Sequence, residues 1–412
     1  MSRRLDVFLN ADLAGCLEQD DHGNLSFHYT PEWLATAQAA PLSAALPLRS
    51  APFKRNECRP FFAGLLPEEA QRTMIARTFG VSDRNDFAIL EKIGAECAGA
   101  ISLLPPGEIP VGGPSAYREV TTAELAAKMA ELPQKPLLAG DAGIRLSLAG
   151  AQSKMAVALD GGRYLLPQNG APSTHILKPQ SARFDHLVEN EFLCMKLAAA
   201  VGLEVAEVSL GTAESIRFLQ VLRYDRKRLP DGTLLRIHQE DFCQALGIPP
   251  ELKYQQEGGP GLKRCFDLVR AVSAVPAVDV LRLFDAVVFN FLIGNGDAHG
   301  KNFSFLHEQG ESRLAPLYDL VCTQAFPHLD PQMAMKIGDE RDPGKVRQKD
   351  WLKFFKEAQV GPTQAIRRMT DLAKRTQESA STWAALHPED AAVTSRIGQN
   401  CTQILSLHQP LS

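Results

Sequence analysis

The strongest constraint on the fold of this sequence is a change of pattern between residues 225 and 240. Up to residue 225, short apolar runs are interrupted by Gly, Pro, Asp and Asn, which is typical of β-strands joined by turns. Beyond residue 240, apolar residues recur at the three- and four-residue spacing of a buried helix, most clearly in VLRLFDAVVFNFLIGN (280–295). We therefore expect an α+β fold, with a β-rich N-terminal half and a mostly helical part at 226–412.

A cluster of Pro and Gly at 105–115 predicts a linker inside the β-rich half. The elements expected before this linker are strands within 5–30, with turns at Gly15 and at 20–24, and helices at 67–79 and 86–93. Those expected after it are strands at 155–159, 163–167, 175–178, 205–210 and 218–224, and helices at 188–201, 281–292, 351–359, 363–377 and 391–407. Strands with one prominent helix are the outline of a kinase N-lobe, so we expect three domains, at 1–105, 116–225 and 226–412.

The composition excludes several classes of protein. Of the 412 residues, 45% are hydrophobic and 22% charged, which suffices for a core, and the net charge of −4 argues against a protein that binds nucleic acid by itself. The eight cysteines form no C-x-x-C pair, so we expect buried thiols in a reducing cytosol and neither a zinc ribbon nor a thioredoxin-like site. The N-terminal apolar run is too short for a signal peptide, and no stretch approaches the roughly 18 apolar residues of a membrane span. We expect a cytoplasmic protein that does not contact a membrane.

The segment GNGDAHGKNFS (294–304) carries the strongest chemical signal. It fits neither G-x-G-x-x-G nor G-x-x-x-x-G-K-[ST], so it is not a glycine-rich nucleotide loop. It does contain D-x-x-x-x-N, from Asp297 to Asn302. This is the spacing of a kinase catalytic loop, in which the Asp accepts the proton of the attacking hydroxyl and the Asn binds magnesium.

The residues after this loop predict a second magnesium ligand. A strand at 303–306, a turn at 308–312 and a strand at 313–318 form a hairpin, whose ends must lie close together. Asp319 should therefore lie beside Asn302, and the two side chains can share one divalent ion with the phosphates of ATP.

Phosphoryl transfer also needs a cation on the phosphates, and Lys178 at the end of the strand HILK is the candidate. Glu191, in the following helix, is placed to pair with it, and Glu189 competes for that role. The small residues of SLAGAQSK (147–154) would let backbone N–H groups approach phosphate closely. His299 lacks histidine partners at metal-ligand spacing, so we expect it to support the loop rather than to bind a metal or act as the base.

Several segments resemble the HipA-type toxin kinases, in the same order as in that family. They are FFAGLLPEEAQR, IGAECAGAISLL, SLAGAQSK, HILKP, VENEF, LRYDR, HQEDFCQALG, KYQQEGGPG, NGDAHGKNFS and LYDL. The resemblance covers about residues 5 to 380, and the first two segments resemble the N-terminal domain of the family. It implies a two-lobed protein-kinase-like fold, with the N-terminal domain packed on the N-lobe.

The resemblance also assigns roles to individual residues. It implies that Asp297 is the catalytic base, that Asn302 and Asp319 hold magnesium, and that Ser147 is autophosphorylated, which switches the enzyme off. The nucleotide-binding residues that it implies are Ala149, Gly150, Ala151, Gln152, Lys178, Leu222, Tyr224, Gln239, His299, Asn302 and Asp319.

The sequence departs from the family pattern at three places. Leu222 stands where relatives often have Glu, which is tolerable because a hinge contacts adenine mainly through its backbone. Ser153 replaces the Glu of GAQEK and adds a second phosphorylatable serine. The catalytic loop begins with GNGD rather than the HRD of eukaryotic kinases.

The resemblance further implies a protein serine/threonine kinase that needs ATP and Mg²⁺ and arrests growth, a property linked to persistence. Such toxins pair with a small helix-turn-helix antitoxin of the HipB type, and operator DNA is bound only by that complex. Relatives phosphorylate translation components such as aminoacyl-tRNA synthetases.

Two other functions remain open on the sequence alone. One is a small-molecule kinase of the aminoglycoside or choline type, which also uses D-x-x-x-x-N, although the N-terminal segments favour the toxin. The other is an inactive kinase-like corepressor. Such a chain would be free to lose Asp297, Asn302, Asp319 or Lys178, and all four are present.

Overall fold

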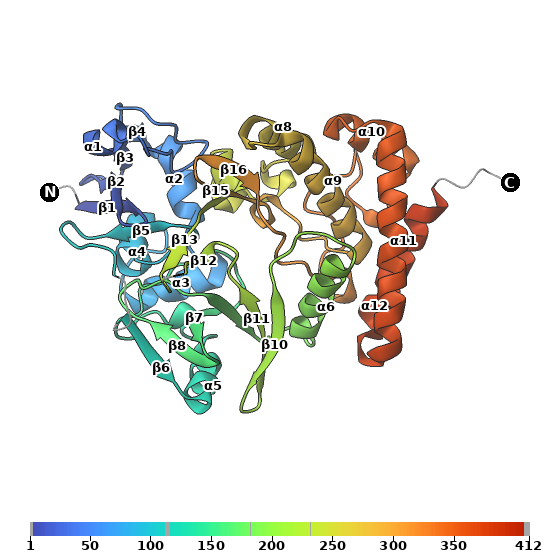
Figure 1. The fold of residues 1–412 in the computed structure, drawn as a ribbon, viewed down its shortest axis with the longest axis horizontal. Helices are drawn as coiled ribbons and strands as arrows, with labels where there is room; N and C mark the ends of the chain where they lie inside the picture. The colour runs from blue at the N-terminus through green and yellow to red at the C-terminus, as the bar shows by residue number, and fades with distance from the viewer. Residues whose placement is uncertain (1–2, 112–115, 182, 231, 408–412) are drawn as a thin grey trace. The chain divides into compact units, whose positions relative to one another are not determined.

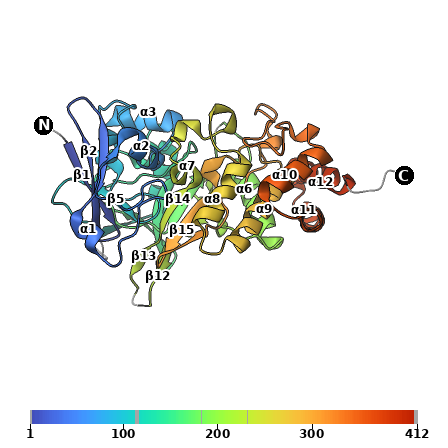
Figure 2. The same cartoon turned by 90° about the horizontal axis from the view of Figure 1, so that it is seen from above.

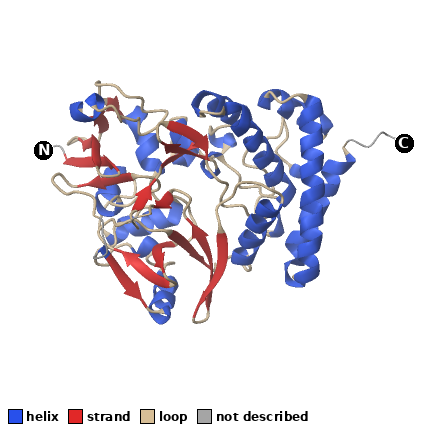
Figure 3. Cartoon of the chain, in the orientation of Figure 1, coloured by secondary structure: helices blue, strands red, loops and turns tan. Residues whose placement is uncertain are grey.

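The computed structural model describes residues 3–111, 116–181, 183–230 and 232–407 (Figure 1). The chain forms two compact units, and each is assembled from separate stretches of sequence. Unit 1 comprises Met1–Pro179, Ser209–Glu251 and Leu306–Glu311, and unit 2 comprises Gln180–Val208, Leu252–Phe305 and Ser312–Ser412. Most strands belong to unit 1 and the long helices to unit 2; Figure 3 shows the strands in red and the helices in blue. The predicted change from strands to helices is thus confirmed.

An antiparallel five-stranded sheet forms the N-terminal part of unit 1, with the strand order β4-β3-β2-β1-β5. Its strands are β1 (Arg3–Leu9), β2 (Asp12–Gln19), β3 (Leu25–Tyr29), β4 (Phe53–Lys54) and β5 (Ile101–Leu104). Four helices accompany it: α1 (Pro31–Ala35), α2 (Arg55–Gly64), α3 (Glu69–Thr78) and α4 (Asp86–Ile93) (Figure 2). Buried aromatic rings join β3 to α2, with the Phe27 and Phe62 centroids 5.3 Å apart.

The predicted turn at Gly15 is wrong. Gly15 lies inside β2, where it pairs with Val7 on one side and Tyr29 on the other. A Cβ atom at this position would lie 2.5 Å from the ring of Phe27. The glycine is therefore required for close packing rather than for a turn, which is a common reason for glycine within a strand.

A second, six-stranded sheet follows in the order β10-β11-β9-β7-β8-β6. Its strands are β6 (Tyr117–Val120), β7 (Met155–Asp160), β8 (Arg163–Pro167), β9 (His175–Pro179), β10 (Val208–Ala213) and β11 (Ile216–Leu222), with helix α5 (Thr122–Glu131) after β6. The predicted strands match β7, β8 and β9 closely, whereas β10 begins three residues later than the predicted 205. The predicted linker at 105–115 has no helix or strand where it is described, and 112–115 lie outside the described residues.

The remaining short elements are β12 (Arg226–Arg228), β13 (Leu234–Arg236), β14 (His238–Asp241), α7 (Phe242–Ala245), β15 (Ser304–Glu308) and β16 (Glu311–Leu314). The strands β15 and β16 form the predicted hairpin. Its turn is tighter than expected, because the chain reverses at Gln309 and Gly310, which both have positive φ. The second strand consequently ends at Leu314 and not at the predicted residue 318.

The long helices of unit 2 are α6 (Leu187–Ala200), α8 (Leu262–Val272), α9 (Pro276–Ile293), α10 (Gln348–Ala358), α11 (Pro362–Leu386) and α12 (Ala391–Ser406). Helices α11 and α12 pack side by side (Figure 1), and α11 extends well beyond its predicted end at 377. The apolar face of α9 packs on α10, where the rings of Phe284 and Phe354 stack at 5.3 Å. Across the described residues, no helix is both long enough and apolar enough to cross a membrane.

Candidate active site

The predicted catalytic loop of unit 2 begins where α9 ends. Gly294 adopts a left-handed conformation (φ 72°) that closes the helix, as glycine commonly does at this position. Asn295, buried next to it, donates to the Asn290 side chain at 2.7 Å, and its Oδ1 accepts the N–H of Asp297 at 3.0 Å. The end of α9 thus fixes the backbone that carries Asp297.

The peptide groups of Gly296 hold the loop from two sides. Its N–H donates to Oγ1 of Thr323 at 2.7 Å, and its carbonyl accepts the N–H of Ala334 at 2.7 Å. A Cβ atom at Gly296 would come within 3.0 Å of the Gln332 carbonyl, so the fit has little room for a side chain. The Asp297 side chain remains exposed to solvent. A rigid loop with an accessible carboxylate suits a general base.

The Asp297 carboxylate has a neighbour that the sequence did not predict. The hydroxyl of Tyr254 donates to Oδ1 of Asp297 at 2.7 Å. The Tyr254 ring lies edge-on to that of His299, with the centroids 5.2 Å apart. His299 is buried, and its Nδ1 accepts the N–H of Lys301 at 3.3 Å. This geometry is that of a histidine supporting the loop.

The hairpin brings the chain back to the end of the catalytic loop. The Tyr318 hydroxyl donates to the carbonyl of Lys301 at 2.6 Å and lies 2.7 Å from the hydroxyl of Ser304. Asp319, the next residue, therefore returns to the segment that contains Asn302. Asp319 also has a positive φ of 53°. A left-handed aspartate is uncommon, and such strained residues cluster at functional sites.

Asn302 fits the magnesium role on its own geometry. Its Oδ1 atom is buried and has no hydrogen-bond partner among the described residues. A buried oxygen of this kind needs a partner, and amide and carboxylate oxygens are what magnesium prefers. Asn302 therefore has an oxygen available for a cation, and the magnesium role of Asn302 and Asp319 stays a prediction.

Lys178, on β9 of unit 1, pairs with Leu219 of β11 and is only 5% exposed. A lysine is rarely this buried unless its charge is compensated. In unit 2, Glu191 is almost fully buried on α6 and Glu189 is half-buried. The choice of partner between these two carboxylates stays a prediction.

The loop of small residues leading to β7 is held through its carbonyl groups. The Ala149 carbonyl accepts from Nζ of Lys154 at 2.5 Å, and Gly150, with φ 104°, accepts from the N–H of Glu68 at 3.3 Å. The Ala151 carbonyl accepts from the Gln71 side chain at 2.6 Å. Residues of α3 and the turn before it thus determine the loop conformation.

Ser147 is completely buried at the start of this loop. Its hydroxyl donates to the carbonyl of Leu65 at 2.8 Å, and its N–H donates to the carbonyl of Glu96 at 2.8 Å. The hydroxyl must leave this position before any phosphate could be attached to it.

The predicted adenine-side residues also lie in unit 1. Leu222 ends β11 with an exposed side chain, and Tyr224 is half-buried two residues later. Gln152 Nε2 and Gln239 Oε1 are buried and lack a hydrogen-bond partner among the described residues. Because buried polar groups are normally satisfied, both predicted nucleotide contacts have an atom available for a ligand.

A buried ionic network lies directly after the predicted hinge. Arg223 donates to Asp225 at 3.0 and 2.8 Å and to Glu96 at 3.2 Å, and Arg226 donates to Glu96 at 3.0 Å. Burial alone would raise the pKa of Asp225, but the two guanidinium groups outweigh it and hold that pKa well below its usual value. The network joins β12 and the hinge to the segment before β5.

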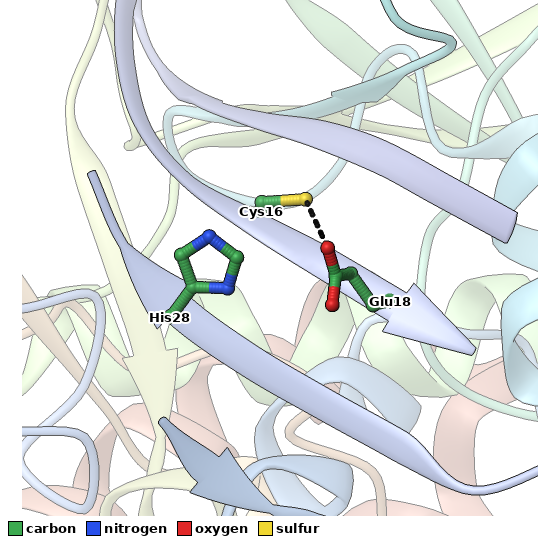
Figure 4. A group of neighbouring side chains, drawn as sticks. All are labelled: Cys16, Glu18 and His28. Carbon is green, nitrogen blue, oxygen red and sulfur yellow. Dashed lines mark hydrogen bonds between the residues drawn. The ribbon is translucent and has the colours of Figure 1, made fainter. Parts of the chain in front are cut away.

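One group of potential metal ligands lies elsewhere, on the N-terminal sheet. Cys16 and Glu18 of β2 and His28 of β3 lie close together, with the Cys16 thiol 3.9 Å from a Glu18 oxygen (Figure 4). Burial raises the pKa of Cys16 to about 12, so the thiol is protonated at neutral pH. Metals bind the thiolate, so this group is better described as a hydrogen-bonded cluster than as a metal site.

Two features of the site could not be predicted from the sequence. Tyr254 stands in the quoted segment KYQQEGGPG, but nothing in its spacing from Asp297 indicated contact. The contacts of Glu68 and Gln71 with the loop at 149–151 join segments about eighty residues apart. Only a comparison across many related sequences could have indicated such pairs.

Several known proteins are similar to this chain. Two family models match the chain: the HipA N-terminal domain over residues 5–104 and the HipA-like C-terminal domain over 146–383. The putative kinase Y4mE of Sinorhizobium fredii is 50% identical over 383 residues, covering 92% of this chain and 91% of that protein. The serine/threonine-protein kinase toxin HipA of Shewanella oneidensis is 31% identical over 392 residues, covering 92% and 89%.

A solved structure confirms the fold. HipA of Shewanella oneidensis MR-1, in a complex with HipB and its operator DNA, matches with a TM-score of 0.83 and 31% identity over 98% of this chain and 96% of that one. The predicted α+β, kinase-like fold is therefore correct. From both domain models, these relatives and the shared fold, we conclude that the chain belongs to the HipA family.

Proposed function

We propose that this protein is an ATP- and magnesium-dependent protein serine/threonine kinase and the toxin of a bacterial toxin–antitoxin pair. The relatives named as kinases, and the HipA toxin among them, support this proposal. The observation that carries it is the catalytic loop, where an exposed, fixed Asp297 precedes Asn302, whose buried Oδ1 has no protein partner among the described residues. We further propose that 1–105, 116–225 and 226–412 act as N-terminal domain, N-lobe and C-lobe.

Asp297 would act as the general base. Its carboxylate accepts the proton of the attacking serine or threonine hydroxyl while that oxygen bonds to the γ-phosphorus, and the bond from phosphorus to the β–γ bridging oxygen breaks to release ADP. Asn302 and Asp319 would hold magnesium, which neutralises charge on the phosphate oxygens when it is bound.

Unit 1 would bind the nucleotide. Lys178 supplies a positive charge for the phosphates, and the N–H groups of residues 149–151 contact them. Leu222 and Tyr224 contact adenine, mainly through the backbone. Gln152 and Gln239 complete the contacts of unit 1 that the family resemblance implies, and His299, which the resemblance also assigns to the nucleotide, belongs to unit 2. The loop carbonyls are already engaged by Glu68, Gln71 and Lys154, so little reorganisation is needed on binding.

Ser147 would regulate the enzyme through self-phosphorylation. A phosphate adds a charge of about −1.5 to −2 at neutral pH, and it would repel the phosphates of ATP. A phosphoserine also cannot donate to the Leu65 carbonyl as the hydroxyl does. Phosphorylation should therefore release the loop and stop the reaction. Ser153, which is nearby, is a second candidate acceptor.

The partners follow from the relatives. The complex of Shewanella HipA with HipB and operator DNA supports a HipB-like helix-turn-helix antitoxin, with DNA contacted through that complex. We propose a component of translation, such as an aminoacyl-tRNA synthetase, as the protein substrate, and growth arrest leading to persistence as the outcome. All eight cysteines are buried and none of them is in a disulfide, which suits a protein that acts in the reducing cytoplasm.

Phosphoproteomics after induction of the wild-type chain and of Asp297→Ala tests the proposal. The wild type should arrest growth and add phosphate to protein, and the variant should do neither while it stays folded. Phosphate found only on a metabolite would indicate the small-molecule kinase instead. A folded wild type that forms no ADP yet represses its operator with the antitoxin would indicate the inactive corepressor.

A further inference from the structure

We propose that Tyr254 is a positioning residue for Asp297, holding one oxygen of its carboxylate so that the other faces the substrate hydroxyl. The inference rests on the proposed function, because it assigns a supporting group to the catalytic base. Both residues belong to unit 2.

The hydroxyl of Tyr254 and the carboxylate of Asp297 form a direct hydrogen bond. A phenol donates its proton to a carboxylate, and the 2.7 Å distance from Tyr254 Oη to Asp297 Oδ1 is that of a good charge-assisted bond. The Asp297 backbone is already fixed by Asn295 and by the two bonds of Gly296. The bond from Tyr254 to one carboxylate oxygen adds a restraint on rotation of the side chain.

Tyr254 is itself held by the segment at 334–336, which also contacts the catalytic loop. Gln255, the next residue, donates its N–H to the carbonyl of Ala334 at 3.2 Å, and its side chain accepts the N–H of Lys336 at 2.8 Å. Ala334 in turn donates to the carbonyl of Gly296. Tyr254 and Asp297 are thus connected through one short strip of backbone.

A tight turn directly after Tyr254 fixes the backbone that carries this residue. The carbonyl of Tyr254 accepts the N–H groups of Glu257 at 3.0 Å and Gly259 at 2.9 Å. A Cβ atom at Gly259 would lie only 2.3 Å from the carbonyl oxygen of Leu252, so this turn needs glycine. The glycines of KYQQEGG therefore allow a tight turn, and this turn places the Tyr254 side chain next to Asp297.

Tyr254 does not take part in proton transfer. Its hydroxyl acts as a hydrogen-bond donor to the carboxylate. Its contribution is to orientation, which affects the rate of the chemical step and leaves ATP binding unchanged. A general base must lie within hydrogen-bond reach of its proton, and losing this alignment should slow the reaction roughly 10-fold.

The test compares the full-length wild type with Tyr254→Phe, Asp297→Ala and the control Tyr164→Phe. The Phe variant keeps the ring against His299 and removes only the hydroxyl. In Tyr164→Phe, the chain loses a hydroxyl bond to Gln220 (3.1 Å) in unit 1, whereas Tyr254 and Asp297 belong to unit 2. ADP formation from MgATP is measured with dephosphorylated casein as the acceptor, together with the half-saturating MgATP concentration and Tm.

We expect Tyr254→Phe to turn over about 10-fold more slowly at saturating MgATP, with unchanged half-saturation and Tm, and Tyr164→Phe to match the wild type. A wild-type rate for Tyr254→Phe, beside an inactive Asp297→Ala, would overturn the inference and leave the proposed function intact. A slow variant with altered half-saturation or lower Tm would show a structural role and also overturn it. A wild type that forms no ADP would instead count against the proposed function.

Discussion

Replacing Glu96 by Gln should destabilise unit 1 strongly, although the two side chains have nearly the same size. Glu96 is 1% exposed, and its Oε1 atom accepts four hydrogen bonds. They come from the N–H (2.7 Å) and hydroxyl (2.9 Å) of Ser173, from Arg226 (3.0 Å) and from Arg223 (3.2 Å). An amide retains the shape of this acceptor but removes its charge.

The charges of the network determine how much Glu96→Gln should lower the free energy of unfolding. The buried cluster contains three guanidinium groups, of Arg223, Arg226 and Arg236, and two carboxylates, of Glu96 and Asp225. Without the charge on Glu96, only one carboxylate faces three cations in a region that water cannot reach. Removing one member of a buried ion pair typically costs about 3–5 kcal/mol. We expect a loss of that size in the free energy of unfolding of unit 1.

Urea denaturation followed by circular dichroism is the suitable assay, because guanidinium chloride would screen the charges under study. The control is Glu119→Gln, whose carboxylate lies 3.4 Å from Arg163 on the surface and is 58% exposed. An exposed pair contributes about 0–1 kcal/mol. If Glu96→Gln were within about 1 kcal/mol of this control, the network would not stabilise the fold as argued.

Three further predictions concern magnesium, regulation and pH. Asp319→Asn should weaken the binding of ATP in the presence of magnesium, while binding of ATP without the metal stays the same. Titrations of ATP at several magnesium concentrations measure this difference. An unchanged dependence on magnesium would refute the role of Asp319 as a magnesium ligand. Incubation with MgATP followed by phosphopeptide mapping should place phosphate on Ser147 and show a loss of activity; phosphate absent from residues 145–154, or a fully active phosphorylated form, would refute that role. Burial and the neighbouring His307 lower the pKa of His238 from about 6.5 to about 3, so the folded state favours the neutral ring. The contribution of His238 to the free energy of unfolding is complete above pH 6.5 and is lost as the pH falls toward 3, by roughly 2 kcal/mol at pH 5. Urea denaturation at pH 7.5 and pH 5 should therefore show a smaller change in the free energy of unfolding for His238→Asn than for the wild type. An equal change in both proteins would exclude His238 as the cause.

Elements with strong local signals were predictable from the sequence. Helix α4 occupies the predicted 86–93 because Asn85 caps it, its side chain accepting the N–H of Ala88 at 3.0 Å. Gly15 misled the prediction because glycine signals both turns and close packing, and only the ring of Phe27 across the sheet decides between them. The strand predicted at 313–318 failed for a similar reason, since the tight reversal at Gln309 and Gly310 shifted the pairing.

In the candidate site, too, only features with a local sequence signal could be predicted. The return of the chain from Asn302 to Asp319 could be predicted because a hairpin brings its two ends together, whereas the roles of these two residues stay predictions. The contact between Tyr254 and Asp297, and those of Gln71 with the loop at 149–151, depend on long-range packing that no local pattern encodes. The roles assigned to these residues remain predictions until variants are tested.

The discontinuous order of unit 1 has a consequence for synthesis on the ribosome. Its last segment, Leu306–Glu311, includes His307, whose ring stacks on His238 and lies 3.2 Å from the buried carboxylate of Glu240. Because a domain folds as a unit while the chain emerges N-terminus first, unit 1 cannot be complete until residue 311 has left the exit tunnel. The catalytic loop has already been translated by then, whereas α10, α11 and α12 have not. A nascent chain therefore carries an incomplete unit 1 through most of translation, and a product truncated before residue 306 should be sensitive to proteases.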